Sequence, residues 1–455
     1  MTTQVSTLAE VGTSPLSARV DRSAYLLHLL ALRSPLPPEL SWFEATREQA
    51  AARLQELAIP STREEAWRFT DLSPLLQVAF VEAEPASVSL ADLEPFLLPE
   101  ARHSRLVFID GVYAPTLSAT SDLPQEIFVG SVRQAHASIQ SKLATYLGKQ
   151  AGGSELFTSL NTASFTDAAV IWVPQGQMVE VPIQLLSIST AIDTPRLNQP
   201  RCLVVAESSS SITLIETYAN LGDGAYFTNP VTEIWVESNA QVNHSRVQQD
   251  GSAAFHIGKT AVSVDRDGRY DNQSISLGGA NDSVARSAIA RHHLEVWQLG
   301  EQTEIVINGL TLLEGEQLSD THSEIVYAKP YGTSRQVHKC IVDDRAHAVF
   351  NGRICVPKLA QLTHAEQLSK SLLLSPRARV DTKPQLEIVA DNVKCSHGAT
   401  VSQLENDEVF YLQSRGIDQE TARKLLVFAF AAEVIDQIPI PSLRDRLSAY
   451  VRAHQ

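Results

Sequence analysis

Apolar residues recur at helical intervals in the first part of the chain. Between Trp42 and Leu57 they follow one another at roughly three- to five-residue steps, and Pro60 comes shortly after the last of them. Such spacing is typical of a helix with one buried face, and proline cannot continue a helix. We therefore predict a mainly helical N-terminal region over residues 1–150.

The middle of the chain has a different pattern, made of short apolar runs rich in Val, Ile and Thr. Between about Ala168 and Lys394 the runs are VIWVP, MVEVPIQLLSI, CLVVAE, ITLIETY, VTEIWVE, AVSVD, SISLG, HHLEVWQL, TEIVINGLTLL, SEIVYA, KCIVDD and AVFNGRICV. Each run has the composition of a β-strand, and no long amphipathic helix interrupts them. Closely spaced strands can form a sandwich, a large barrel or a parallel β-helix, which periodicity alone does not separate.

Glycine-containing pairs favour the β-helix among these three folds. Gly278-Gly279, Asn308-Gly309 and Asn351-Gly352 fall between or within the runs, where the chain of a solenoid would turn its corners. We predict a mainly β fold with a parallel β-helix core over residues 151–398, flanked by helical regions.

The pattern becomes helical again after Gly398. The segment NDEVFYLQSR is followed by Gly416, which is suited to ending a helix, and Asp418 is suited to capping the next one. We predict a helical C-terminal region over residues 399–455.

The helix expected after Asp418 is apolar on nearly every side. Its main stripe consists of Ala422, Leu425, Leu426, Ala429, Phe430 and Val434, and the apolar residues off this stripe are Val427, Phe428, Ala431 and Ile435. Such a helix must be covered on two sides. Its own neighbours or a partner protein could provide the second cover.

Composition and charge exclude several classes of partner. The chain has 455 residues, 44% of them hydrophobic and 20% charged, as in soluble globular proteins. Its 37 Lys and Arg against 52 Asp and Glu give a net charge of −15. Phosphate backbones and anionic lipids would repel such a chain, and no basic patch stands out. We expect neither nucleic acid nor a membrane as a partner.

Three further features indicate a cytoplasmic protein. The longest apolar run, Leu425 to Ala432, is far short of the ~20 residues that span a bilayer. The N-terminal segment MTTQVSTLAEVGTS lacks the charged and apolar parts of a signal peptide. The four cysteines form no C-x-x-C pair, which suits a reducing compartment.

Three weak motifs have simpler structural explanations. The segment AAFHIGKT, residues 253–260, resembles a phosphate loop, but it holds bulky residues and leads into a strand pattern, so we predict no nucleotide site. Asp265 and Asp267 lack the rest of a calcium loop and fit a surface turn. His292 and His293 are adjacent, so on a strand they point to opposite faces and cannot share one metal.

The segment Lys394-Cys395-Ser396-His397-Gly398 carries more information. In an extended chain Cys395 and His397 point to the same side, where a thiolate and an imidazole suit iron, zinc or a transferring sulfur atom. Lys394 and the imidazole are expected to lower the pKa of the thiol. Two ligands leave a metal site incomplete, so a partner would have to supply the others. The alternative is that Cys395 and His397 are purely structural. A cysteine hydrolase fits poorly, because its catalytic base normally comes from a distant part of the sequence and not from the same strand.

Three stretches resemble the SufD branch of the SufB/SufD family, which belongs to the SUF machinery for iron-sulfur cluster assembly. The most specific stretch runs from Asp381 to Ile435 and contains KCSHGAT and FYLQSRGI. NGRICVPKLAQLTHAEQLSKSLLLSPRARV, just before it, and STREEAWRFTDL, near the N-terminus, also resemble the family. The resemblance extends over essentially the whole chain from about Ser23.

The resemblance implies a right-handed parallel β-helix that acts as a scaffold and is not itself an enzyme. It implies pairing with the paralogue SufB, binding of the ATPase SufC through the C-terminal helices, and a homodimer when SufB is absent. Cys395 and His397 would contribute to a transient iron or iron-sulfur site at the interface with SufB. The residues expected to contact SufC are Tyr411, Arg415, Leu425, Leu426, Phe428 and Phe430.

Two alternatives and several questions stay open. A SufB-like paralogue shares the same elements, although the KCSHGAT wording and the chain length favour SufD. A β-helix carbohydrate-active enzyme would need paired carboxylates on one face, and no such cluster stands out. Cys355 lies in a strand pattern and fits a structural role, whereas Cys202 and Cys340 are ambiguous. The routes of iron and sulfur and the involvement of a flavin are not determined by the sequence.

Overall fold

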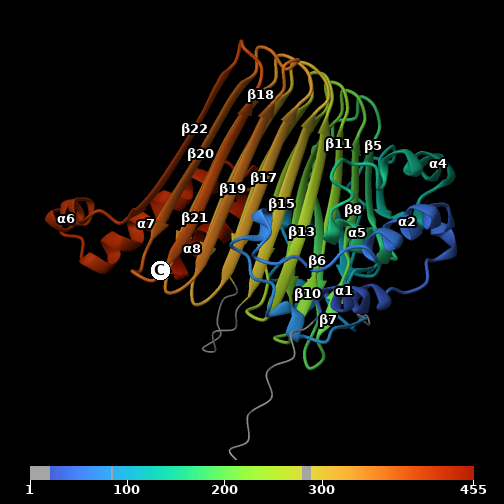
Figure 1. Cartoon of the computed structure of the whole chain (residues 1–455), viewed down its shortest axis with the longest axis horizontal. Helices are drawn as coiled ribbons and strands as arrows, with labels where there is room; N and C mark the ends of the chain where they lie inside the picture. The colour runs from blue at the N-terminus through green and yellow to red at the C-terminus, as the bar shows by residue number, and fades with distance from the viewer. Residues whose placement is uncertain (1–20, 83–85, 279–287, 455) are drawn as a thin grey trace, which may run out of the picture.

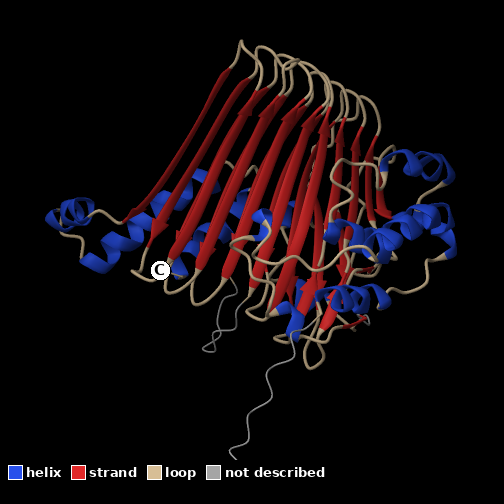
Figure 2. Ribbon diagram, in the orientation of Figure 1, coloured by secondary structure: helices blue, strands red, loops and turns tan. Residues whose placement is uncertain are grey.

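A computed structural model describes residues 21–82, 86–278 and 288–454 as a parallel β-solenoid with helices at both ends (Figure 1, Figure 2). Eight strands of one sheet, sheet A, alternate along the chain with eight strands of a second, sheet B. Within each sheet these strands run parallel and pair coil upon coil. The mainly β fold with flanking helices is therefore confirmed. The segment MTTQVSTLAEVGTS lies outside the described residues.

The strands of sheet A, in spatial order, are β4 (Phe128–Ser131), β5 (Ala169–Val173), β8 (Arg201–Ala206), β11 (Val231–Val236), β13 (Ala254–Val264), β15 (Ile289–Gln298), β17 (Leu318–Tyr327), β19 (His347–Val356) and β21 (Arg379–Ile388). The short strands beside them are β1 (Val81–Glu82), β7 (Arg196–Asn198) and β10 (Tyr226–Thr228). Those of sheet B are β3 (Val112–Tyr113), β2 (Arg105–Ile109), β6 (Ile183–Ser189), β9 (Ser211–Asn220), β12 (Gln241–Gln249), β14 (Arg269–Leu277), β16 (Glu304–Leu313), β18 (Thr333–Val342), β20 (His364–Leu373) and β22 (Lys394–Gln403).

Helices cover the outer faces of the two sheets at opposite ends of the solenoid. The N-terminal ones are α1 (Arg22–Ala31), α2 (Glu44–Leu54), α3 (Leu90–Leu93), α4 (Ala137–Tyr146) and α5 (Leu156–Ser164), with short 3-10 helices η1 (Pro38–Phe43), η2 (Glu65–Trp67), η3 (Leu75–Gln77), η4 (Pro99–Ala101) and η5 (Val132–Gln134). Helices α1, α2, α4 and α5 pack on the first coils of sheet A. The C-terminal helices are α6 (Asn406–Ser414), α7 (Gln419–Ile435) and α8 (Pro441–Ala453). Helices α7 and α8 pack on the outer face of sheet B. Strands β2 and β4 join the two sheets before residue 150. The domain boundary that we placed at residue 150 stays a prediction.

One type of corner repeats along the solenoid and forms the regular row of turns at the top of Figure 1. A residue with positive φ recurs about every 30 positions there, and its N–H donates to a carbonyl of the next coil. The corner residues are Gly176, Ser209, Asn239, Asp267, Gln302, Tyr331 and Leu362. Most are not glycine, although positive φ is unfavourable for other residues. The stacked hydrogen bonds hold that conformation, and Asp265 and Asp267 lie in one of these turns, as predicted.

Two of the three glycine-containing pairs that we expected at corners lie elsewhere. Gly309 and Gly352 are in the middle of β16 and β19. A Cβ on Gly309 would collide with the ring of His338, and one on Gly352 would collide with Gln367 and Phe350. These glycines make room for large side chains inside the solenoid, so the turn assignment was wrong for these two pairs. Gly278 directly follows the end of β14, and Gly279 lies outside the described residues.

The polar strands at the end of the solenoid were also missed. Strand β20 is HAEQLSKSLL, and β22 continues to Gln403, whereas helical structure was expected from residue 399. Main-chain pairing with β20 keeps β22 extended, with Ser402 opposite Leu372. Ladder hydrogen bonds thus decide the conformation here, whatever the local composition.

The interior of the solenoid is apolar near the repeated corner and polar in the other half. The apolar half contains residues such as Val204, Ile234 and Val262. In the polar half the buried Glu216 accepts hydrogen bonds from Tyr218 and Thr232 and contacts His244. Although burial would raise the pKa of Glu216, its contacts, led by His244, lower it to about 2.

Candidate functional site

The last coil, β21 and β22, forms the end of the solenoid at the left of Figure 1. Among the described residues, β21 pairs only with β19 and β22 only with β20, so each strand has one edge without a ladder partner. Apolar side chains are exposed beside these edges: Val389 is 65% and Val401 is 47% exposed. Unpaired edges with apolar side chains are suited to pairing with another chain.

Cys395 and His397 lie on the same face of β22, as the alternation of side chains predicts. Cys395 is opposite Ala365 of β20, and His397 is opposite Gln367. Ala365 and Gln367 are both buried inside the solenoid. Cys395 is half-buried against the apolar interior cluster, and His397 is exposed. Both side chains therefore face the open end of the interior.

The expected lowering of the Cys395 pKa is wrong. Burial raises the pKa of this thiol, and a hydrogen bond with the Ala365 backbone offsets this only in part. Lys394 is the adjacent residue on the strand, so its side chain points to the opposite face. The thiol is thus mainly protonated at neutral pH unless a metal or a partner favours the thiolate.

Hydrogen bonds between polar side chains lead along the interior to this last coil. The Gln336 amide donates to Ser323 over 2.7 Å, and the Gln367 amide donates to Gln336 over 2.8 Å. His397 is the next residue in the same row, opposite Gln367. The polar half of the interior therefore reaches the solenoid end beside His397.

The C-terminal helices leave part of their surface open. Tyr411 of α6 is 57% exposed, and the Arg415 guanidinium lies 5.2 Å from the centre of its ring. Leu425 of α7 is 45% exposed, and Leu426 is half-buried. Phe410, which the sequence did not single out, is 69% exposed.

Phe428 and Phe430 pack against the chain's own core. The Arg452 guanidinium lies 4.3 Å from the ring centre of Phe428, and the Lys339 ammonium lies 4.3 Å from that of Phe430. The buried residues of α7 are Ala422, Val427, Ala431, Val434 and Ile435. The main apolar stripe that we assigned to this helix from the sequence is therefore largely not its buried face. Apolar residues on every side made the helical period ambiguous, and contact with β16 and β18 selects the buried face.

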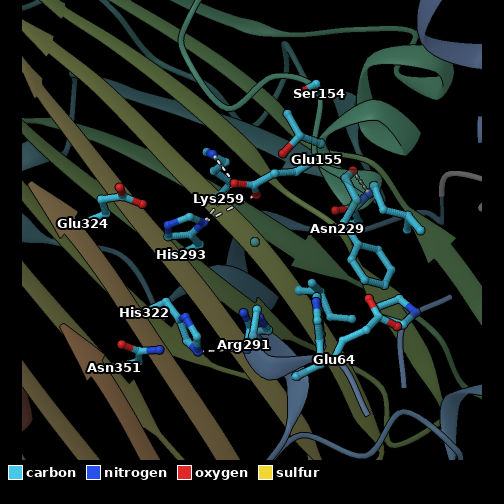
Figure 3. Close-up of a pocket in the computed structure, with 18 of the residues that line it drawn as sticks. Glu64, Ser154, Glu155, Asn229, Lys259, Arg291, His293, His322, Glu324 and Asn351 are labelled. Carbon is cyan, nitrogen blue, oxygen red and sulfur yellow. Dashed lines mark hydrogen bonds and ion pairs between the residues drawn. The ribbon is translucent and has the colours of Figure 1, made fainter. Parts of the chain in front are cut away.

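A cavity of about 450 Å³ lies on the outer face of sheet A, under the segments around Trp67 and Glu155 (Figure 3). Lys259, His293, His322 and Asn351 come from successive coils and form one row along its floor. No local motif could reveal this cavity, because Glu155 is 138 positions from His293 in the sequence.

The weak motifs have the structures expected of them. Residues 254–264, which include most of the suspected phosphate loop, form strand β13. His292 is buried and contacts Thr260 over 3.0 Å, whereas His293 faces the outer cavity. The two imidazoles are thus on opposite faces of β15, and the chemistry of His293 depends on residues far away in sequence.

Comparison with known proteins identifies the family. Residues 188–430 match the model of the SufBD core domain of SUF-system FeS cluster assembly, and residues 38–185 match that of the SufBD N-terminal region. The chain belongs to the SufBD family. It is thus an iron-sulfur cluster assembly protein of the SUF system.

Relatives of this SufBD-family chain match it over most of its length. An iron-sulfur cluster assembly SufBD-family protein of Synechocystis is 46% identical over 88% of this chain and 88% of its own. The chloroplastic protein ABCI7 of Arabidopsis thaliana is 37% identical, covering 89% of this chain and 85% of its own. The iron-sulfur cluster assembly protein SufD of Escherichia coli is 32% identical, covering 89% and 92%.

Two of the other three cysteines of the SufBD-family chain are buried, and the third lies on the outer side of sheet A. Cys202 and Cys340 are buried, and burial raises the pKa of both thiols. Cys355 donates to the carboxylate of Glu387 over 3.3 Å on the outer side of sheet A. Burial and this carboxylate raise its pKa to about 11.

No described helix is long and apolar enough to cross a membrane, and the cytoplasmic location stays a prediction.

The raised thiol pKa predicts slow alkylation of Cys395 at neutral pH. Because only the thiolate reacts, its rate with iodoacetamide should rise about tenfold per pH unit from pH 7 to 9. Peptide mass spectrometry of the native chain measures this rate, and Cys355 is the internal comparison. Fast, pH-independent alkylation of Cys395 at pH 7 would contradict the assignment.

Proposed function

We propose that this chain is the SufD-type scaffold subunit of the SUF assembly machinery and works with SufB and the ATPase SufC. The main support is the last coil, in which an unpaired edge and the Cys395–His397 pair occur together. The relatives named SufD, which match most of the chain, favour the SufD position over the SufB position.

The exposed edge of the last coil is the surface proposed for pairing with SufB. The unpaired edge of a strand offers main-chain donors and acceptors that a strand of a second solenoid can satisfy. The exposed side chains of Val389 and Val401 would lose contact with water in such a pair. In the absence of SufB a second copy of this chain could occupy the same edge.

Cys395 and His397 would then lie at the interface and bind iron of the nascent cluster, which is the cargo of the machinery. His397 supplies an imidazole ligand and Cys395 a thiolate. Metal binding removes the thiol proton and thereby overcomes the raised pKa of Cys395. Two ligands from this chain require the remainder from SufB, so the site is complete only in the complex.

The SufC-binding surface is proposed at the exposed parts of α6 and α7. Tyr411, Arg415 and Leu425 are accessible, and Phe410 extends the apolar surface. Aromatic residues and arginine contribute most strongly to protein interfaces. Phe428 and Phe430 support this surface from beneath, because their rings already pack within the chain.

Replacing His397 with Ala should leave the complex with SufB and SufC intact and abolish cluster assembly. The imidazole is exposed, so its removal costs little stability, yet it takes away a ligand. Reconstitution with iron and sulfide, followed by the absorbance of the cluster, measures the effect. His364→Ala, at the exposed start of β20, is the matched control. Normal assembly by the His397→Ala complex would contradict the proposal.

A second substitution tests the helical surface. Tyr411→Ala combined with Leu425→Glu should weaken SufC binding at least tenfold, about 1.4 kcal/mol, because it removes an exposed ring and places a charge in the contact. Binding is measured by titration calorimetry with purified SufC. Leu359→Glu, at a leucine that is 77% exposed on the repeated corner, is the control. Equal affinity of the double variant and the control would place SufC elsewhere.

A further inference from the structure

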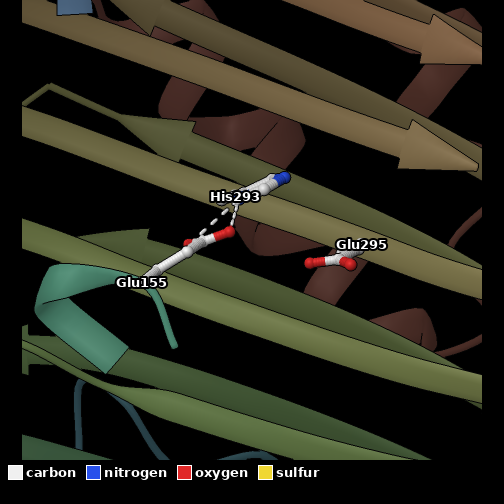
Figure 4. A group of neighbouring side chains, drawn as sticks. All are labelled: Glu155, His293 and Glu295. Carbon is white, nitrogen blue, oxygen red and sulfur yellow. Dashed lines mark hydrogen bonds and ion pairs between the residues drawn. The ribbon is translucent and has the colours of Figure 1, made fainter. Parts of the chain in front are cut away.

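A second group of potential metal ligands lies far from the last coil. One ligand atom each from Glu155, His293 and Glu295 can be chosen so that all three lie within 4.8 Å of one another (Figure 4). Glu155 directly precedes the first residue of α5, whereas His293 and Glu295 are two positions apart on β15 and share its outer face. Around one ion such atoms lie roughly 3 to 4 Å apart, so small side-chain rotations suffice to close the site.

One outer group already orients Glu295, and Glu155 and His293 contact each other. The Trp297 indole donates to one carboxylate oxygen of Glu295 over 2.6 Å. The Nδ1 atom of His293 lies 3.2 Å from a carboxylate oxygen of Glu155. An outer group such as the Trp297 indole holds a metal ligand in place in proteins.

A cation already lies between the carboxylates. The Lys259 ammonium is 2.8 Å from Glu155 and also contacts Glu295. It offsets one of the two carboxylate charges and leaves the other without a matching cation in the group. The arrangement therefore attracts positive charge beyond that of the lysine.

Space on both sides of Lys259 allows the ammonium to be displaced. The residue lines the cavity of about 450 Å³ that contains His293, and also a second cavity of about 320 Å³ that contains Glu233. An ion can enter from the first cavity, and the second gives the ammonium space to turn away from the two carboxylates. His322 lies on the next coil, with its ring centre 6.2 Å from that of His293.

We propose that Glu155, His293 and Glu295 form a binding site for a divalent first-row transition metal ion, with the Lys259 ammonium as its resting occupant. One imidazole and two carboxylates suit ions such as Mn²⁺, Fe²⁺, Co²⁺ and Zn²⁺ better than the softer Cu⁺. This site is separate from the last coil and does not rest on the proposed scaffold function.

Cobalt binding to the full-length chain tests the site. The background carries Cys395→Ser and His397→Ala, so that the last coil cannot bind the ion. Titration with Co²⁺, followed by its visible absorption, should show one bound ion per chain. Lys259→Met removes the competing ammonium and should tighten binding at least tenfold. Adding Glu295→Gln or His293→Gln to Lys259→Met should reverse that gain.

Glu324→Gln is the matched control, because Glu324 lies opposite Glu295 on the next coil but outside the ligand group. It should leave the Co²⁺ affinity unchanged. Circular dichroism establishes that each variant is folded, and Lys259→Gln replaces Lys259→Met if the latter does not fold. Absence of saturable binding in the background overturns the proposal. So does a folded Lys259 variant whose affinity does not respond to Glu295→Gln and His293→Gln.

Discussion

Main-chain pairing between successive coils is the constraint on which the rest of this structure depends. Each strand between the ends of the solenoid obtains its ladder hydrogen bonds from the coil before it and the coil after it. The same pairing repeats a strained corner at residues such as Ser209 and Tyr331 and holds the polar strand β22 extended. It also means that a stack of coils has an end. In the described chain that end is formed by β21 and β22, each with one unpaired edge, and β22 carries Cys395 and His397.

Coil-on-coil register also turns single residues into rows. Lys259, His293, His322 and Asn351 are far apart in sequence but adjacent on sheet A. Inside the solenoid, Gln336, Gln367 and His397 follow one another in the same way. Clusters of polar side chains therefore arise from register, whereas the helices decide which rows are covered. The N-terminal segments lie over the first row, enclose the cavity and reach the outer face of β21, where Glu65 contacts Lys383. His397, at the end of the second row, is exposed.

The sequence predicted the features that depend on local pattern. The strand runs, the helix caps at Gly416 and Asp418, and the shared face of Cys395 and His397 all follow from periodicity or residue type. Features that depend on distant partners were not predictable. A glycine is needed at position 309, inside a strand, because the ring of His338 fills the space that a side chain would take. The pKa of Cys395 is raised by burial, and the neighbouring Lys394 does not lower it. The contact of Glu155 with His293 joins segments 138 positions apart.

The central claim is that a second SUF subunit completes the last coil. Amide hydrogen exchange of β21 and β22, compared between the isolated chain and its complex with SufB, tests this directly. The account predicts that amides of Lys394–Gln403 exchange at least tenfold more slowly in the complex, while the corner residues of the earlier coils are unchanged. Unchanged exchange of β22 in a complex that protects other segments would contradict it.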